Sequence, residues 1–570
     1  MVAAPRSYNL ADVWEMAADA VPEREALVVG DRRSSYAQIE ERANRLAHHL
    51  ADDVGVGVGD HVALYLENCP EYLEAMLAAF KLRAVPINVN HRYVADELAH
   101  LLDDSGAVAL ITQPSLVAAV EAVVAEGGTA VRHVLVTGEA YEKALAAASP
   151  NRPDPGDRGD ADHYVIYTGG TTGLPKGVVW RHDDAFFACI GGGDPMRLHG
   201  PVTSPDQLPG RINDNPLTYL PLAPMMHAAA QWTSLSRLYA GDRVVLMAGS
   251  LDPAAVWRAV ADEAVNIITV VGDAVARPLL DEWDQAGGYD ASSLFVFSNG
   301  GAPLSSATKE RVLARLPQVV LADGFGSSEA GTQGASRITA GDVTHGAGIG
   351  TFDQPAKATI VIGADGARVT PGSGEVGMVL AGGRLPLGYH NDPVKTAAAF
   401  VERDGERWLV TGDMAAVASD GSIELRGRGS QAINTGGEKV FPEEVEGVLM
   451  AHPAVYDCLV VGVPDQRWGS AVCAVVAPVT SVAPGAPGSG ASAPGSDPSA
   501  PGSSASREGG GPSAPGGGPT LDELVAHCKA RMAGYKAPKR LVLVDRVVRS
   551  PSGKADYRWA AAVARERLGR

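Results

Sequence analysis

One short stretch combines residue types that bind phosphate. Residues 167–177 read Tyr-Thr-Gly-Gly-Thr-Thr-Gly-Leu-Pro-Lys-Gly, with four glycines, three threonines and one lysine, and they directly follow the apolar-leaning run 163–166. Glycine adopts positive φ angles without strain and lets a phosphate approach the main chain closely. Backbone N–H groups, threonine hydroxyls and the Lys176 ammonium group would therefore face a polyanion together. The stretch predicts a phosphate-binding loop at the end of a strand.

This loop differs from the P-loop of kinases and GTPases. A P-loop ends in Gly-Lys-Ser/Thr, whereas here Lys176 comes three residues after Gly173 and is followed by Gly177. Pro175 would also interrupt a helix that started there. A glycine-rich surface turn is the simplest alternative, but the hydroxyls, the lysine and the preceding strand together favour phosphate binding. The same spacing argues against a kinase or an ATP-hydrolysing motor.

Length, composition and charge limit the class of protein. A chain of 570 residues is too long for one core and should form two or more domains. Its 45% apolar content is ordinary for a soluble protein. The net charge of −19 argues against a general nucleic-acid binder, because neutralising a phosphate backbone needs a basic face. An anionic ligand must therefore be held by a local cluster of donors.

Cysteine usage and the N-terminus suggest a compartment. The five cysteines are odd in number and include no CxxC pair, which fits reduced thiols inside a cell. The first seven residues lack the core of a signal peptide, and no uninterrupted apolar run is long enough to span a bilayer. The cytoplasm is the expected location. The cysteines are Cys69, Cys189, Cys458, Cys473 and Cys528.

The elements around the loop alternate between strand and helix patterns. Such alternation predicts βαβ units with parallel sheets, whose ligands bind at the carboxyl ends of strands. Loop 167–177 would lie at such an end. Helices are expected over 10–20, from 36 with Ser35 as N-cap, and over 70–81. Strands are expected at 25–29, 61–66, 85–90, 107–112, 131–136, 244–247, 267–271 and 294–298.

Later segments carry further loop and turn signals. Glycine-rich loops are expected after strands at 298–303 and 323–330. Residues 345–428 are richer in strands and turns, with hairpin signals at 363–366 and 419–421.

Residues 481–519 differ in composition from everything else. They are nearly all Pro, Gly, Ser and Ala, so we expect disorder. A domain linker would be the simplest interpretation. However, the run 471–477 before it and the helix expected at 521–532 after it both fit one small α/β unit. We therefore interpret the segment as an insertion within a domain, because long loop insertions cost little closure entropy.

Six motifs occur in an order and spacing that resemble the adenylate-forming (AMP-binding) superfamily, which contains acyl-CoA synthetases, peptide-synthetase adenylation domains and luciferases. The resemblance extends from the first helices to residue 558. The sequences at 180–183, 323–329 and 434–439 are most similar to acyl-CoA synthetases of the fatty-acid and sterol-side-chain type. The six motifs are the loops 167–177, 298–303 and 323–330, then Thr411-Gly-Asp413, Gly427-Arg428 and Ser550-Pro-Ser-Gly-Lys554.

The resemblance implies an architecture and a reaction. The fold would be α/β, with a large N-terminal domain (1–428) of βαβ-built sheets plus a β-rich subdomain, a hinge at 429–430, and a small mobile α+β C-terminal domain (431–570). A carboxylate would attack the α-phosphate of ATP to give an acyl-adenylate and pyrophosphate. The thiol of coenzyme A would then displace AMP. ATP, Mg²⁺, CoA and a hydrophobic acid such as a fatty acid are the implied cofactor and substrates.

The first half-reaction needs preorganised donors around phosphate. The resemblance implies that Lys554 bridges the reacting oxygens, that Glu329 binds the metal and that Thr172 is the third catalytic residue. Asp413 would accept hydrogen bonds from the ribose hydroxyls beside Arg428, and Phe325 stands where the family usually has a tyrosine near adenine. The implied ATP- and AMP-binding residues are Thr168, Gly169, Gly170, Thr171, Thr172, Gly173, Lys176, Gly301, Ala302, Pro303, Asp323, Gly324, Phe325, Gly326, Ser328, Asp413, Arg428 and Lys554.

The second half-reaction needs Lys554 to withdraw. In the family the C-terminal domain rotates about a hinge that usually holds an aspartate or a lysine, and this position corresponds to Ser430 after Gly429. Without those charged contacts, the balance between the two conformers stays open. The loop implied to enter the site from the CoA side holds Gly436, Gly437, Glu438 and Lys439.

The acyl pocket is the least defined part. His227 resembles the residue that gates the acyl tunnel, and Trp232 would border the pocket with Met225, Met226 and residues 228–230; these apolar side chains would equally suit an ordinary core. A ligase that loads a carrier-protein phosphopantetheine is the main alternative function, and a nucleotide-binding protein that has lost catalysis is another. The identity of the acid and the oligomeric state stay open.

Overall fold

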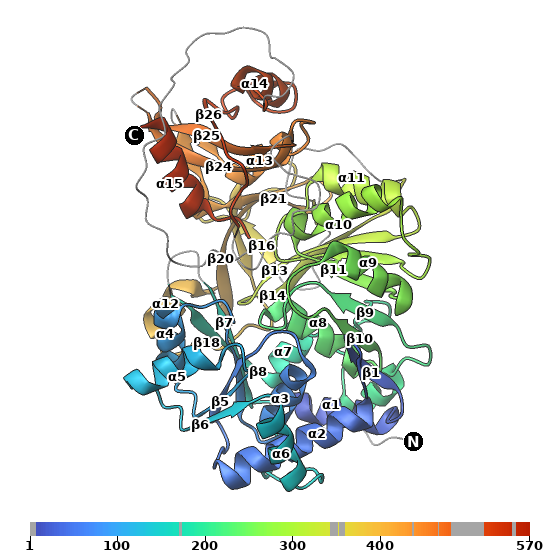
Figure 1. Ribbon diagram of the computed structural model, residues 1–570. Coiled ribbons are helices and arrows are strands. Elements are labelled where there is room, and N and C mark those ends of the chain that lie inside the picture. Colours follow the sequence, from blue (N-terminus) through green and yellow to red (C-terminus); the bar gives the residue numbers. More distant parts are fainter. Residues whose placement is uncertain are drawn as a thin grey trace, which may run out of the picture.

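A computed structural model provides the structure (Figure 1), and it describes residues 7–169, 174–341, 351–352, 359–435, 438–465, 467–479, 518–549 and 554–569. Several predicted features lie outside these residues. They are Gly170, Thr171, Thr172 and Gly173 of the glycine-rich loop, Gly436 and Gly437 of the CoA-side loop, most of the 481–519 insertion, and residues 550–553 before Lys554.

Two sheets form the body of the large domain, and both are mainly parallel with antiparallel strands at their edges. The first runs in the order β14 (Gly331–Ile338), β13 (Val320–Ser327), β12 (Val296–Asn299), β11 (Ile267–Val270), β9 (Thr218–Pro221), β10 (Arg243–Leu246), β1 (Glu25–Val29) and β2 (Arg32–Ser35). The second runs in the order β18 (Gly388–Tyr389), β8 (Lys176–Arg181), β7 (His163–Thr168), β4 (Val85–Asn88), β3 (His61–Tyr65), β5 (Ala109–Thr112) and β6 (His133–Val136).

Helices separate and cover these sheets in layers. The largest core cluster joins apolar side chains of both sheets to helices α1, α2, α3 and α8, and every residue of α3 is buried. A second cluster packs α9, α10 and α11 on the outer face of the first sheet, and a third packs α4 and α5 on the outer face of the second sheet. The result is a five-layer α/β arrangement.

The helices of the large domain are α1 (Leu10–Ala20), α2 (Tyr36–His48), α3 (Pro70–Lys81), α4 (Ala95–Ser105), α5 (Val117–Glu126), α6 (Glu139–Ala147), α7 (His182–Ala188), α8 (Ala228–Tyr239), α9 (Pro253–Asp262), α10 (Gly272–Ala286), α11 (Ser306–Arg315) and α12 (Pro393–Ala399). A π-helical turn, η1 (His49–Asp53), continues α2, and a 3₁₀ segment, η2 (Pro205–Arg211), precedes β9. Among the described residues, no helix is long and apolar enough to cross a membrane.

An antiparallel sheet forms the β-rich part, as expected for residues 345–428. Its order is β15 (Thr351–Phe352), β21 (Ile423–Arg428), β20 (Glu406–Val417), β17 (Gly377–Ala381) and β16 (Thr359–Ile362), with β19 (Phe400–Arg403) paired to β20. The expected turn at 419–421 connects β20 to β21. This connection brings residue 413 opposite residue 428.

The C-terminal part builds its own sheet, in the order β23 (Glu438–Val440), β22 (Ile433–Thr435), β25 (Gly469–Pro478) and β24 (Val455–Asp465), with β26 (Arg540–Leu543) paired to β25. Helices α13 (Pro442–Leu449), α14 (Leu521–Lys529) and α15 (Tyr557–Leu568) accompany it, and it lies above the large domain in Figure 1. Strand β25 precedes the 481–519 segment and β26 follows it, yet the two strands pair. One sheet therefore includes both flanks of that segment.

Most predicted elements are confirmed, and one loop prediction needs correction. Helix α1, the Ser35 N-cap of α2, and α3 form as predicted, while several strands are one or two residues shorter than expected. Residues 323–327 were expected to form a loop after a strand, but they continue β13 and pair with β14. The glycine-rich loop follows strand β7, as predicted, and connects it to the antiparallel strand β8.

Candidate functional site

Lys176, Glu329 and Tyr389 form one connected group of polar side chains. Lys176 begins β8 opposite Thr168 at the end of β7, so its position is fixed by the hairpin that carries the glycine-rich loop. Its Nζ lies 3.2 Å from Glu329 Oε1 and donates to Tyr389 Oη at 2.8 Å. Tyr389 Oη in turn donates to Glu329 Oε1 at 3.0 Å. The predicted loop lysine and the predicted metal-binding glutamate thus lie together, linked by a tyrosine.

The Glu329 carboxylate is kept ionised. Burial raises its pKa, but the charge of Lys176 and the hydrogen bonds from Lys176 and Tyr389 outweigh burial, so that the pKa lies below its ordinary value. Among the described residues, no group of three or more His, Cys, Asp or Glu side chains could hold a metal. Mg²⁺ is commonly bound by one or two carboxylates together with substrate phosphates. A single ionised glutamate beside a phosphate loop fits that mode.

Asp413 and Arg428 face each other across β20 and β21. Their Cα atoms are register partners, and Arg428 Nε lies 3.3 Å from Asp413 Oδ1. Thr411 Oγ1 accepts a hydrogen bond from Asp413 N at 3.1 Å, which shapes the bend before the aspartate. Burial raises the pKa of Asp413, and Arg428 partly opposes this. The pair offers one carboxylate and one guanidinium group to a ligand.

Lys554 reaches this group from the C-terminal domain. Lys554 is exposed to solvent, but the surrounding protein atoms and the nearby Arg428 lower the pKa of its ammonium group, while Glu329 and Asp413 raise it and only partly compensate. Lys554 is therefore within electrostatic range of both carboxylates of the large domain. The two domains together therefore surround one charged site.

His227 lies at the start of α8, on the same side of the site. Burial and the charge of Lys554 lower its pKa to about 3, so the imidazole is neutral. Its Nε2 atom is buried and finds no hydrogen-bond partner within the described part of the chain. Trp232, one turn further along α8, packs edge-on against Trp180 with ring centroids 6.4 Å apart. Met225 and Met226 are buried next to His227.

Asn88 ties the glycine-rich hairpin to the His227 segment. At the end of β4, its Nδ2 donates to Tyr167 O at 2.8 Å and to Met226 O at 2.7 Å, and its Oδ1 accepts from Tyr167 N at 2.7 Å. The side chain is buried. Asn88 therefore fixes the entry to the phosphate loop relative to the residue before His227.

The predicted adenine wall is held by other side chains. Asn299 donates to Ala302 O at 3.0 Å and to Asp323 Oδ1 at 2.7 Å. Asp323 also pairs with Lys309 at 2.5 Å, so its carboxylate is engaged within the protein. Gly301 has a φ of +85°, and the ring of Phe325 packs against Phe352 with centroids 4.7 Å apart. Of the remaining predicted nucleotide-binding residues, Pro303 lies in the loop after β12, and Gly324 and Gly326 lie within β13. Ser328 follows β13, and its carbonyl oxygen accepts a hydrogen bond from Trp180 Nε1 at 3.0 Å.

The predicted hinge is a single 3₁₀ turn, η3 (Gly429–Gln431), and it contains Gly429 and Ser430. Beside it, Arg428 N donates to Glu443 Oε1 of α13 at 3.5 Å. Gly427 has a φ of +129°, and a Cβ there would collide with the Glu443 carboxylate. Glu438 and Lys439 of the predicted CoA-side loop are exposed on β23.

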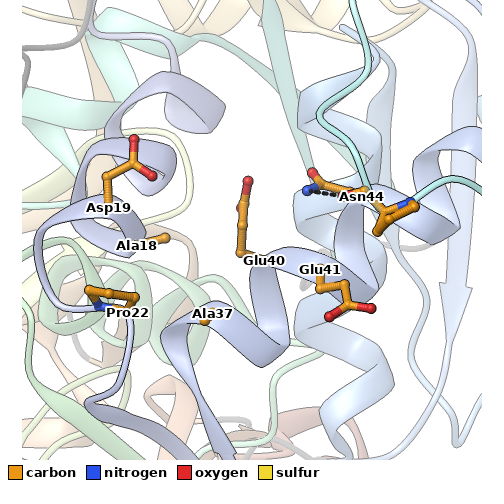
Figure 2. A pocket seen from close by; sticks show the side chains of 8 residues that line it. Ala18, Asp19, Pro22, Ala37, Glu40, Glu41 and Asn44 are labelled. Carbon is orange, nitrogen blue, oxygen red and sulfur yellow. Dashed lines mark hydrogen bonds between the residues drawn. The ribbon is translucent and has the colours of Figure 1, made fainter.

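A hollow between α1 and α2 lies apart from this site (Figure 2). It presents the carboxylates of Asp19, Glu40 and Glu41, which would repel phosphate. Glu40 is already paired with Lys81 at 2.8 Å and with Arg152 at 2.7 Å, and Arg152 also binds Asp19 at 2.8 Å. These residues hold α1, α2 and α3 together and do not extend the phosphate site.

Two residues of the site, Tyr389 and Asn88, were missed from the sequence. Tyr389 follows a glycine in the run Pro386-Leu-Gly-Tyr-His390, which carries no local signal for chemistry. Asn88 offered a better signal, because it is a polar residue that ends the apolar run 85–87. In both cases the partners come from distant segments, which spacing alone does not reveal.

Comparisons with known proteins match the chain to AMP-binding enzymes and show that it is similar to CoA ligases. The profile described as AMP-binding enzyme matches residues 14–390, and that of the AMP-binding enzyme C-terminal domain matches residues 444–487. The chain is 42% identical to a 3-oxocholest-4-en-26-oate–CoA ligase of Rhodococcus rhodochrous, over 97% of this chain and 95% of the relative. It is 41% identical to a medium/long-chain-fatty-acid–CoA/3-oxocholest-4-en-26-oate–CoA ligase of Mycobacterium marinum, over 97% and 96%.

Solved structures share the fold. The crystal structure of the anthranilate CoA ligase AuaEII in complex with anthranoyl-AMP has a TM-score of 0.80 and 22% identity, and the alignment covers 98% of each chain. The α/β class and the two-part architecture expected from the sequence are thereby confirmed.

Proposed function

The chain belongs to the AMP-binding enzyme family, and we propose that it is an ATP-dependent acid–CoA ligase that acts through an acyl-adenylate. One observation carries the proposal: Lys554 of the C-terminal domain lies near Glu329 and Asp413 of the large domain, and Glu329 is paired with Lys176 of the phosphate loop. A lysine delivered by a second domain into a nucleotide site suits an adenylation step.

In that step a carboxylate oxygen of the acid forms a bond to the α-phosphorus of ATP, and the bond to the bridging oxygen breaks, which releases pyrophosphate. Lys554 would neutralise the reacting oxygens. Lys176 and the threonines of the loop, including Thr172, would hold the departing phosphates. Asp413 would accept hydrogen bonds from the ribose hydroxyls, and this would fix the position of the α-phosphate.

Glu329 is the residue that would hold Mg²⁺. When bound, the ion would offset negative charge on the phosphates. Lys176 and Tyr389 keep Glu329 ionised, which favours binding of the cation. When Mg²⁺ binds, Lys176 would either contact the same carboxylate as the ion or move toward the phosphates.

In the second step the CoA sulfur attacks the acyl carbonyl, the bond to AMP breaks, and the thiol proton is released. We propose that Lys554 leaves the site for this step through a rotation about Gly429 and Ser430. The loop holding Gly436, Gly437, Glu438 and Lys439 would then line the path of the pantetheine.

The proposed acid is hydrophobic, either a medium- or long-chain fatty acid or a sterol side-chain acid. The relatives of about 40% identity carry names of both kinds. His227, which stays neutral, and Trp232 would border the acyl pocket together with the two buried methionines, and a neutral apolar wall favours an uncharged chain.

Pyrophosphate release measured over a panel of carboxylic acids, with and without CoA, tests the proposal. We expect release only with hydrophobic acids, together with AMP and an acyl-CoA product when CoA is present. No acid-dependent release would exclude the ligase. Release without an acyl-CoA product would instead indicate that the acyl group is loaded onto a carrier protein.

A further inference from the structure

One face of α10 carries Asp273, Arg277 and Asp281, spaced four residues apart, and this face meets the C-terminal domain. Figure 1 shows α10 at the end of the large domain beneath the C-terminal sheet. Residues four apart lie above one another on a helix. We propose that these three residues, the α10 clasp, position Lys554 for adenylation by holding the C-terminal domain in place. The inference rests on the function proposed above for Lys554.

Arg277 makes the central contacts of the clasp. Its Nη2 donates to Met450 O at 3.2 Å and its Nη1 donates to Tyr456 O, and both carbonyls belong to the C-terminal domain. Its Nε lies 3.2 Å from Asp273 within α10, which fixes the direction of the side chain. The planar guanidinium group presents several donors in a fixed geometry, so it can serve two carbonyls at once.

Asp281 adds a side-chain contact one turn further along. Tyr456 Oη donates to Asp281 Oδ2 at 3.3 Å, and Arg311 Nη1 holds the same aspartate at 2.6 Å. Burial and the charge of Asp281 raise the pKa of Tyr456 to about 12, so the phenol remains a donor at neutral pH. Tyr456 is therefore bound to α10 twice, through its carbonyl oxygen by Arg277 and through its hydroxyl by Asp281.

A short chain of contacts leads from Tyr456 to Lys554. The next residue, Asp457, accepts two hydrogen bonds from Arg549: one from Arg549 Nε at 3.0 Å and one from Arg549 Nη2 at 2.5 Å. Arg549 forms an antiparallel bridge with Ala555, the neighbour of Lys554. Burial lowers the pKa of Arg549, but Asp457, with help from Glu446 and from Asp273 of the clasp, outweighs burial and raises it. The segment that carries the lysine is thus tied to α10.

The α10 clasp supplies contacts that favour one domain arrangement, and the hinge residues lack such contacts. Ser430 brings no charged side chain that could favour one domain arrangement over another. The contacts of Arg277 and Asp281 exist only while Met450 and Tyr456 lie against α10, so they stabilise this arrangement selectively. Weakening them should lower the population in which Lys554 occupies the site, and leave the thioester step, which does not use Lys554, intact.

The test compares Arg277→Ala with Arg258→Ala, since Arg258 is an exposed arginine on the neighbouring helix α9. Three quantities are measured on the full chain: acid-dependent pyrophosphate release, thioester formation from supplied acyl-AMP and CoA, and the rate at which an amine-acetylating reagent modifies Lys554, followed by mass spectrometry. Tyr456→Phe is the second variant, because it removes only the hydroxyl that meets Asp281.

For Arg277→Ala we expect adenylation to fall by at least about tenfold, the size typical of hydrogen bonds to a charged group. Thioester formation should be retained, and Lys554 should be acetylated more slowly, because it is exposed in the site and would leave the surroundings that lower its pKa. Tyr456→Phe should show the same pattern more weakly and Arg258→Ala no change. An equal loss of both half-reactions, or unchanged adenylation and acetylation, would overturn the clasp. If the unaltered enzyme released no pyrophosphate, the ligase function would fail while acetylation still tested the clasp.

Discussion

Lys176 and Glu329 form an ion pair with 3.2 Å between Nζ and Oε1, and this pair joins the phosphate-loop hairpin to the turn after β13. Tyr389 bonds to both members, and its ring lies 3.9 Å from Lys176 Nζ. If Lys176 binds phosphate and Glu329 binds Mg²⁺, as proposed, the ion pair holds the two groups in position before MgATP binds. Preorganisation of this kind lowers the cost of binding.

Removing the Tyr389 hydroxyl should weaken the binding of MgATP, because Lys176 and Glu329 would be held less firmly in position. In Tyr389→Phe the ring remains beside Lys176, but both hydrogen bonds are lost, and we expect the KM for MgATP to rise by about tenfold, as for hydrogen bonds to charged groups. The KM for the acid should change little. Steady-state pyrophosphate release at varied MgATP measures the effect, with the exposed Tyr535→Phe as the control. An unchanged KM for MgATP together with a reduced kcat would contradict a role in nucleotide binding.

The sequence predicted much of this site because its polar residues lie in short local motifs. The glycine-rich loop stood out by residue type, and the order of the motifs, through the family resemblance, identified Asp413, Arg428 and Lys554. Asp413 and Arg428 pair in the structure, and their charges influence Lys554. The N-cap role of Ser35 was predicted correctly because capping depends on neighbours along the chain.

Long-range pairing explains what was missed. Gly324 and Gly326 were interpreted as loop residues, but they continue β13, and a Cβ on Gly326 would collide with the backbone of Gly331 on β14. Glycine there serves a close approach between strands, which no local pattern indicates. Tyr389 and Asn88 likewise act through partners far away in sequence.

Asp413 should govern recognition of the ribose. If its carboxylate accepts hydrogen bonds from the 2′- and 3′-hydroxyls, the enzyme should prefer ATP over 2′-deoxy-ATP, and Asp413→Asn should reduce that preference by about tenfold. The ratio of kcat/KM for the two nucleotides is the measurement, and Asp420→Asn, in the exposed turn between β20 and β21, is the control. If the ratio is the same in Asp413→Asn as in the unaltered enzyme, the ribose hydroxyls do not bind to Asp413.

His227 should make the folded state sensitive to acid. Its pKa is about 3 in the folded chain, against about 6.5 for an unperturbed imidazole, so between these values only the unfolded state binds the proton. The free energy of unfolding therefore falls as the pH is lowered below about 6.5. Urea midpoints at pH 7.5 and pH 5 should differ less in His227→Asn than in the unaltered chain. The exposed His199→Asn should behave like the unaltered chain, and an equal acid sensitivity in all three would refute the assignment.

The 481–519 insertion should be dispensable for catalysis. Its described flanks are close together, because a Cβ on Gly518 would lie 3.0 Å from Pro478 Cγ at the end of β25. Replacing residues 481–517 with a short glycine-serine connection should therefore leave both half-reactions within about twofold, since shortening a loop changes closure entropy only slightly. A large loss of adenylation in a variant that keeps its thermal midpoint would show that the segment contributes to the site.

The most direct test of the account is the fate of the two half-reactions in Lys554→Ala. Lys554 belongs to the C-terminal domain, the charges of Glu329 and Asp413 influence its ammonium group, and it is proposed to serve adenylation alone. We predict that Lys554→Ala loses ATP-dependent adenylate formation while it still forms acyl-CoA from supplied acyl-AMP and CoA at the rate of the unaltered enzyme. An equal loss of both half-reactions, or full retention of adenylation, would contradict the central claim that this lysine completes the adenylation site.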